Sequence, residues 1–319
     1  MMAPMTTPRK CLLLDTASLY YRAYFGVPES VKAPDGTPVN AVRGLLDFIA
    51  RLVRDHRPDE LVACTDNDWR PAWRVALVPS YKAHRVAEES AGGPDTAGAS
   101  PAEETPDTLA PQIPVIEAVL DAVGIARVGA DGYEADDVIG TLVRRAGGPA
   151  DVVTGDRDLF QLVDDARGVR VLYPVKGMGD PLVVDEAGLR EKYGVASGAA
   201  YADLALLRGD PSDGLPGVPG VGEKTAARLL EAYGDLDGIL AAVGDPASGL
   251  TPAQRRKLDA AREYLTVAPK VVRVAEDVPL PRFDPTLPAE PLHAQELQEL
   301  AERWGLGGSL RRLLDALAG

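Results

Sequence analysis

The sequence predicts an α/β protein in which a mostly parallel sheet is flanked by helices and is followed by a smaller helical module. Short apolar runs, typical of buried strands, alternate with helix-like segments over the first two-thirds of the chain. Acidic residues close three of these runs, at Asp15, Asp66 and Asp156. After Tyr201 the pattern changes to helices joined by glycine-rich turns.

The spacing of apolar residues predicts the individual elements of the first part. A strand ending at Asp15 precedes a helix over 40–55, and a second strand ends at Asp66. The elements expected next are a helix over 114–123, a strand over 125–128, a helix over 134–145 and a strand over 152–154. The stretch 87–111 has almost no large apolar residue, so we expect a disordered or mobile insertion there.

The last third of the chain predicts a helical module and a helical tail. Apolar spacing and closing glycines indicate helices over 202–207, 224–233, 252–265, 295–304 and 309–317. The glycines at 305, 307 and 308 separate the last two.

Composition indicates a globular protein of one large and one smaller domain, since 45% of the 319 residues are apolar. Cys11 and Cys64 lie in strand-like runs and are expected to be buried thiols. No apolar run reaches membrane-spanning length or forms a signal-peptide core, so we expect a cytoplasmic protein. The net charge of −14 alone argues against a nucleic-acid partner, but bound divalent cations would weaken that field.

Acidic residues in five clusters are candidate metal ligands. Buried carboxylates are costly unless they are paired or bind a metal, and the carboxyl ends of parallel strands meet at one edge of a sheet. Oxygen ligands without a His or Cys cluster suit Mg²⁺ or Mn²⁺. Single clusters have ordinary alternatives, because acidic residues are favoured at helix starts and Asp158 suits a helix N-cap. The nine candidates are Asp15, Asp66, Glu134, Asp136, Asp137, Asp156, Asp158, Asp210 and Asp213.

Two further motifs suit nucleic-acid phosphates. Glycines allow the backbone of 217–227 to approach a phosphate at the start of a helix, although a plain interhelical turn is the alternative. This motif lacks the full signature of a nucleotide-binding P-loop.

Basic and aromatic residues gather over 69–85 in an otherwise acidic chain, where they suit phosphates and unpaired bases. The alternative for this stretch is a solvated charged loop with buried tryptophans.

Together these motifs resemble the flap endonuclease/5′-3′ exonuclease family, and most closely the N-terminal nuclease domain of bacterial DNA polymerase I. The resemblance runs from about Lys10 to the C-terminus and is weakest across 87–111 and beyond 270. Thr16 stands where the family usually has glycine, and Asn67-Asp68-Trp69 replaces a small, glycine-containing turn. The resemblance is carried by Leu14-Asp15, Tyr20-Tyr21-Arg22-Ala23-Tyr24, Tyr81-Lys82-Ala83-His84-Arg85, Gly132-Tyr133-Glu134-Ala135-Asp136-Asp137, Thr154-Gly155-Asp156-Arg157-Asp158-Leu159 and Gly209-Asp210-Pro211-Ser212-Asp213.

The resemblance implies a PIN-like nuclease core over 1–200, an arch region over 68–111, a helix-3-turn-helix module over 201–290 and a tail over 291–319. It implies a stand-alone, monomeric enzyme that hydrolyses phosphodiesters near the 5′ ends of branched, nicked or gapped DNA in replication and repair. RNA primers and RNA–DNA hybrids are further candidate substrates. The alternatives are a PIN-type ribonuclease acting on structured RNA, which would lack the hairpin, and a non-catalytic DNA-junction binder, which would lose carboxylates.

The resemblance also implies roles for individual residues. Two or more Mg²⁺ ions, with Mn²⁺ as a substitute, would be held at a first site by Asp15, Asp66, Glu134, Asp136 and Asp137, and at a second by Asp156, Asp158, Asp210 and Asp213. Lys82 and Arg85 would act on the scissile phosphate. A potassium ion on the hairpin carbonyls is a further candidate. The remaining expected DNA contacts are Tyr21, Arg70, Arg74, Tyr81, Gly217, Gly220, Gly222, Lys224 and Thr225.

Overall fold

The structure is a computed structural model that describes residues 9–86, 105–175 and 179–319. A six-stranded sheet has the order β3-β2-β1-β4-β5-β6. Neighbouring strands are parallel except β6, which runs antiparallel to β5. The strands are β1 (Cys11–Asp15), β2 (Glu60–Cys64), β3 (Ala126–Val128), β4 (Ala150–Val153), β5 (Val169–Tyr173) and β6 (Leu182–Val184).

Helices cover both faces of the sheet. Successive side chains of the central strand β1 point to opposite sides, so apolar residues on both faces need to be covered. Leu12 and Leu14 pack into one apolar core, and Cys11 and Leu13 pack into the other. The first core includes residues of α1 (Thr16–Gly26), α2 (Asn40–His56), α4 (Ile113–Val123), α12 (Ala294–Trp304) and α13 (Gly307–Leu317). The second includes residues of α5 (Ala135–Arg145), α6 (Glu186–Tyr193) and α7 (Gly198–Arg208).

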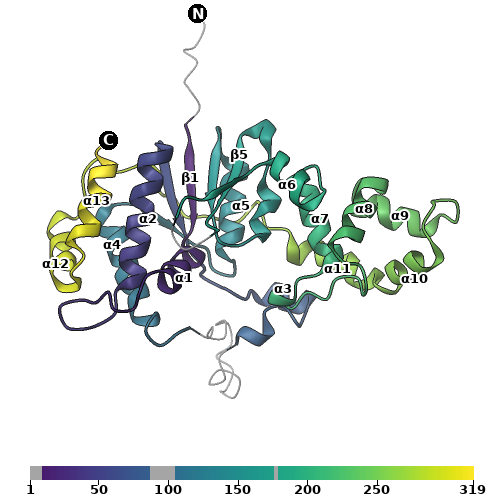
Figure 1. Cartoon of the computed structure of the whole chain (residues 1–319), viewed down its shortest axis with the longest axis horizontal. Helices are drawn as coiled ribbons and strands as arrows, with labels where there is room; N and C mark the ends of the chain where they lie inside the picture. Colours follow the sequence, from purple (N-terminus) through teal and green to yellow (C-terminus); the bar gives the residue numbers. More distant parts are fainter. Residues whose placement is uncertain (1–8, 87–104, 176–178) are drawn as a thin grey trace, which may run out of the picture.

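A helical module extends from the end of the molecule opposite α12 and α13 (Figure 1). It continues from α7 through α8 (Glu223–Tyr233), α9 (Leu236–Gly244), α10 (Pro252–Ala260) and α11 (Arg262–Val272). The short helix α3 (Ala72–Leu77) contacts α11. The 3₁₀ turns in the described residues are Ala83–Arg85, Ala110–Gln112, Asp158–Leu162, Asp165–Arg167 and Pro211–Asp213.

The single helix predicted over 252–265 is wrong, because the chain turns at Ala261. The two resulting helices pack on different partners, α10 on α9 and α11 on α7, which requires a change of direction. Of the predicted insertion over 87–111, residues 87–104 lie outside the described part of the chain. The rest is ordered against the core, where Leu109 is fully buried and the Thr108 hydroxyl lies 2.7 Å from the Tyr24 hydroxyl.

None of the helices in the described ranges combines the length and the apolarity that a membrane crossing requires.

Candidate active site

An acidic cleft lies at the carboxyl edge of the sheet, where β1 is flanked by both β2 and β4. The chain passes from β1 to β2 on one side and returns to β4 on the other, which is the switch point at which open α/β sheets bind ligands. The cavity has a volume of about 370 Å³. Seven of the nine predicted carboxylates line it: Asp15, Asp66, Glu134, Asp136, Asp156, Asp158 and Asp210.

Asp15 lies at the centre of this edge, since it ends β1 and caps the start of α1. The Thr154 hydroxyl donates to one of its oxygens at 2.6 Å, and the Ser18 amide donates to the other at 3.2 Å. Burial, together with the charges of Asp66 and Asp156, raises the pKa of Asp15 to about 7 despite these hydrogen bonds. The site therefore concentrates negative charge beyond what its own donors stabilise.

The same repulsion acts on two other carboxylates of the cleft. Burial and the charges of Asp15 and Asp156 raise the pKa of Asp136 well above its usual range. Burial and the charge of Asp156 do the same for the pKa of Asp158. A hard divalent cation is the ligand that such an oxygen-rich, repulsive donor set suits. In the part of the chain that is described, no three Asp, Glu, His or Cys side chains lie close enough to hold one ion directly.

Lys82 brings a positive charge into the cleft. Its backbone is left-handed (φ 47°), and its amide donates to the Asp213 carbonyl at 3.0 Å, which holds the residue over the acidic loops. Its ammonium contacts the Glu134 carboxylate. Burial opposes the charge and is the largest single influence on it, but Glu134, Tyr81, Asp213 and Asp136 together raise the pKa of Lys82 well above its usual value. Arg85 also lines the cleft and pairs with Asp213 at 2.7 Å.

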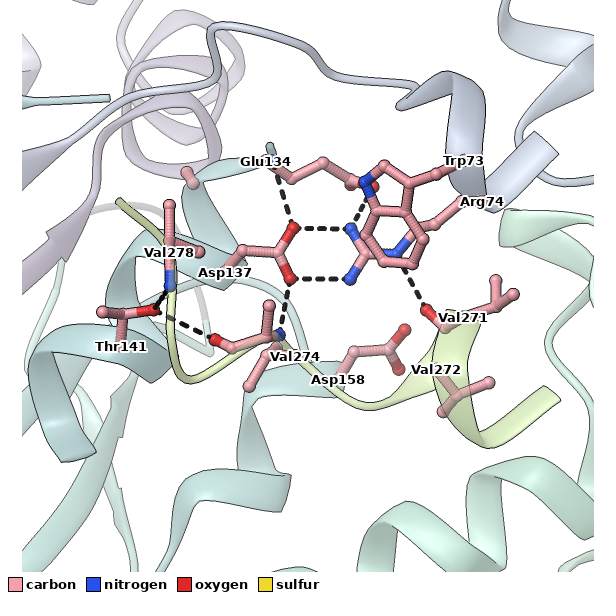
Figure 2. A network of polar contacts seen from close by, with 12 residues as sticks. Trp73, Arg74, Glu134, Asp137, Thr141, Asp158, Val271, Val272, Val274 and Val278 are labelled. Atoms are coloured by element: carbon pink, nitrogen blue, oxygen red, sulfur yellow. Dashed lines mark hydrogen bonds and ion pairs between the residues drawn. The ribbon is translucent and has the colours of Figure 1, made fainter. Parts of the chain in front are cut away.

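The geometry contradicts a ligand role for Asp137 and a DNA-contact role for Arg74. The Asp137 carboxylate is fully buried and forms two 2.7 Å bonds with the Arg74 guanidinium, which is itself only 2% exposed (Figure 2). The sequence places Asp137 on the same helix face as Glu134. In the structure, however, Asp136 lines the cleft, and Asp137 points into the protein.

Two predicted DNA contacts, Tyr81 and Arg70, bond to other groups of the protein, and Tyr81 is buried while Arg70 is half-buried. Tyr81 is 4% exposed and donates its hydroxyl to Glu134 at 2.8 Å. Arg70 donates to the Tyr81 carbonyl at 2.6 Å and to the Pro79 carbonyl at 3.2 Å, so it stabilises the loop in front of Lys82. Tyr21, by contrast, lines the cleft.

The glycine-rich hairpin combines one packed glycine with two exposed ones. A Cβ on Gly217 would lie 2.4 Å from the Gly209 amide, so this buried glycine is required for packing. Gly220 and Gly222 are exposed, and Gly222 directly precedes α8. Lys224 is also exposed and Thr225 is half-buried, both in the first turn of α8.

The N-terminal part of the chain, residues 10–194, matches the family model described as "5'-3' exonuclease, N-terminal resolvase-like domain". Residues 196–295 match "5'-3' exonuclease, C-terminal SAM fold". The chain belongs to the 5′-3′ exonuclease family.

Curated relatives of this exonuclease include both stand-alone and fused proteins. A 5′-3′ exonuclease of Streptomyces coelicolor is 74% identical over 96% of this chain and 99% of its own. A 5′-3′ exonuclease of Mycobacterium tuberculosis is 52% identical over 96% of this chain and 97% of its own. DNA polymerase I of Mycobacterium bovis is 36% identical over 96% of this chain, which corresponds to 32% of that polymerase.

Solved structures share the fold of the exonuclease at low identity. T5 5′-exonuclease with bound zinc has a TM-score of 0.64 at 16% identity, covering 97% of this chain and all of that one. The catalytic core of Rad2 in complex with DNA substrate has a TM-score of 0.58 at 15% identity, covering 97% of this chain and 93% of that one.

The sequence did not predict two arginines of the acidic cleft, Arg157 and Arg208. Arg157 lines the cleft between two predicted ligands. Arg208 lies between the hairpin and the acidic loops, 3.3 Å from Glu223 and 3.8 Å from Asp210. The sequence places Arg157 between Asp156 and Asp158, so its position in the cleft could have been predicted. Nothing in the sequence around Arg208 indicates that it also lines the cleft.

Proposed function

We propose that this 5′-3′ exonuclease hydrolyses phosphodiesters near the 5′ ends of flapped, nicked or gapped DNA, with Mg²⁺ as its metal. The observation that carries the proposal is the convergence of seven carboxylates on one cavity at the switch point of the sheet. RNA primers in RNA–DNA hybrids are included in the proposed substrates, because the phosphodiester on which the cleft would act is common to RNA and DNA. The proposal further includes a cytoplasmic monomer with a core over 1–200, a hairpin module over 201–290 and a tail over 291–319.

The donor set suits Mg²⁺, with Mn²⁺ as a substitute, because every proposed ligand atom is a carboxylate oxygen. Divalent ions bound in the cleft would lower the pKa of a water and stabilise charge on the attacking and leaving oxygens. One group of ligands would be Asp15, Asp66, Glu134 and Asp136, and the other Asp156, Asp158 and Asp210. Several would act through bound water, which Mg²⁺ releases reluctantly.

The cations of the cleft act on the phosphate. The Lys82 ammonium and the Arg85 guanidinium, both facing the cavity, would stabilise the negative charge that develops as the phosphodiester is attacked. Both are held ready by acidic partners, Glu134 and Asp213 respectively. Tyr21 offers a ring on which a base beside the scissile bond can stack.

The hairpin would hold duplex phosphates through its exposed backbone and Lys224. A potassium ion on its carbonyls does not fit at Gly220, because the Lys257 ammonium already donates to that carbonyl at 3.0 Å. We therefore assign no step to potassium.

Cleavage of labelled DNA tests the proposal. Wild-type protein is incubated with 5′-flap, nicked and single-stranded DNA in Mg²⁺, with EDTA as the metal control. We expect Mg²⁺-dependent release of short 5′ products from the flap and the nick. Binding without cleavage would support a junction-binding protein instead, and cleavage of structured RNA alone would support a PIN-type ribonuclease.

A further inference from the structure

Residues 271–278, which we call the return segment, lead the chain away from the end of the helical module. Figure 2 shows Val271, Val274 and Val278 of this segment near Asp137 and Thr141. The segment begins with the last two residues of α11 and lies along α5, the helix that begins beside Glu134. The Thr141 hydroxyl of α5 donates to the Ala275 carbonyl at 3.3 Å and accepts from the Val278 amide at 3.1 Å. The return segment is therefore fixed to the helix that carries part of the acidic cleft.

Arg74 connects this segment to two other parts of the chain. Its Nε donates to the Val271 carbonyl at 3.0 Å, and its terminal nitrogens donate to Glu134 at 2.9 Å and to Asp137. Its guanidinium also lies over the Trp73 ring, 4.5 Å from the ring centre. One buried side chain thus joins α3, the start of α5 and the end of the module.

The Asp137 carboxylate is used entirely within this network. One oxygen accepts from Arg74 and from the Ala275 amide, both at 2.7 Å. The other accepts from Arg74 at 2.7 Å and from the Glu134 amide at 3.3 Å. Figure 2 shows the carboxylate enclosed by these donors. Asp137 therefore does not line the acidic cleft.

The hairpin end of the module is joined to the acidic loop that follows α7. Gly217 packs on Gly209, directly before Asp210. A Cβ on Gly214 of the same loop would lie 2.0 Å from the Ser80 carbonyl, in the segment before Lys82. The hairpin and this acidic loop therefore pack as one unit. The other end of the module, at the end of α11, is attached to α5 through the return segment.

We propose that Arg74, Asp137 and the return segment form a latch that sets the position of the hairpin-bound duplex relative to the core carboxylates, and thereby selects which phosphodiester is cut. This inference rests on the proposed DNA-cleaving function. Successive base pairs are about 3.4 Å apart along a duplex. A module displaced by that distance would bring a neighbouring phosphodiester to the metals.

The test compares product lengths at single-nucleotide resolution on one 5′-flap substrate. Arg74→Lys keeps the charge but loses the two-pronged contact, and Asp137→Asn keeps the shape but loses the charge. We expect both variants to spread cleavage over phosphodiesters about one step from the wild-type position. Glu276→Gln is the matched control, because it breaks an exposed pair with Arg144 between the same α5 and return segment, and it should keep the wild-type pattern.

Product length separates a positioning role from a merely structural one, because unfolded molecules do not cut and can lower only the yield. Unchanged lengths in both variants would overturn the latch, and rescue of the Asp137→Asn rate by added Mg²⁺ at unchanged lengths would identify a metal ligand instead. Hydrogen exchange of the Ala275 amide, which donates to Asp137, is a measurement that does not depend on cleavage. We expect faster exchange in Asp137→Asn, and unchanged protection of this amide would also overturn the latch. Failure of the wild type to cut flap DNA would refute the proposed function instead.

Discussion

Asp15 shows how the acidic cleft destabilises the chain that contains it. Its pKa is raised to about 7, mainly by burial and then by Asp66 and Asp156, whereas an unfolded aspartate titrates near 4. Between these values the native state binds more protons than the unfolded state. The free energy of unfolding therefore falls as the pH rises from about 4 to about 7, and the full penalty is present above pH 7.

Asp15→Asn should raise the melting temperature of the metal-free protein at pH 8 and abolish turnover. The substitution removes a buried charge whose raised pKa corresponds to at most roughly 4 kcal/mol. Thermal unfolding in EDTA at pH 8 and at pH 5 measures the difference, which should be much smaller at pH 5. Asp55→Asn, a change at a surface aspartate of α2, should shift neither value. An equal gain at both pH values would show that the buried charge of Asp15 is not what destabilises the fold.

Lys82→Ala should slow the chemical step more than it weakens binding. Its ammonium faces the cleft and would stabilise developing charge on the phosphate, a contact worth about 10²–10³-fold in rate. Single-turnover rates at saturating flap DNA, together with affinity measured in Ca²⁺, separate the two effects. Lys224→Ala, at the start of α8, is the comparison and should lower affinity and the salt dependence of binding while preserving the saturated rate. If Lys82→Ala weakened only binding and Lys224→Ala slowed only the saturated rate, the assignment of Lys82 to the chemical step and Lys224 to binding would be refuted.

At the scale of the element, the hairpin offers a matched pair of glycines. A Cβ on Gly222 would meet no atom within 4 Å, and its backbone is extended, so Gly222→Val should fold as the wild type does. The added side chain should nevertheless keep duplex phosphates away from the start of α8 and weaken binding. Gly217→Ala should instead lower stability, because Gly217 has φ 62° and is packed on Gly209. Melting temperature and duplex affinity distinguish the two, and wild-type affinity of Gly222→Val would remove the hairpin from the binding site.

For the whole molecule, the sequence predicted the sheet and its acidic edge because both depend on local patterns. Apolar runs ending in Asp15 and Asp66 report a buried strand and its carboxyl end without knowledge of the partner strands. The role of Asp137 could not be predicted in this way, because its partner Arg74 lies 63 residues away and is brought close only by the packing of α3 against the core. Helical spacing gives a shared face, but it does not say which face meets the solvent.

The helices α12 and α13 pack on α4 and α2, whose apolar residues share one core with them and with Leu12 and Leu14 of β1. In α13, which packs on α2, Leu313 is fully buried, and no residue of this helix lines the acidic cleft. Leu313→Ala should therefore lower the free energy of unfolding by about 2–5 kcal/mol while the cleavage rate at 25 °C stays at the wild-type value. Arg312→Ala, also in α13, breaks an exposed pair with Asp47 of α2 and should cost less than about 1 kcal/mol. Denaturant unfolding and flap cleavage on the same samples measure both quantities, and a rate that falls in proportion to stability would show that α13 also shapes the cleft.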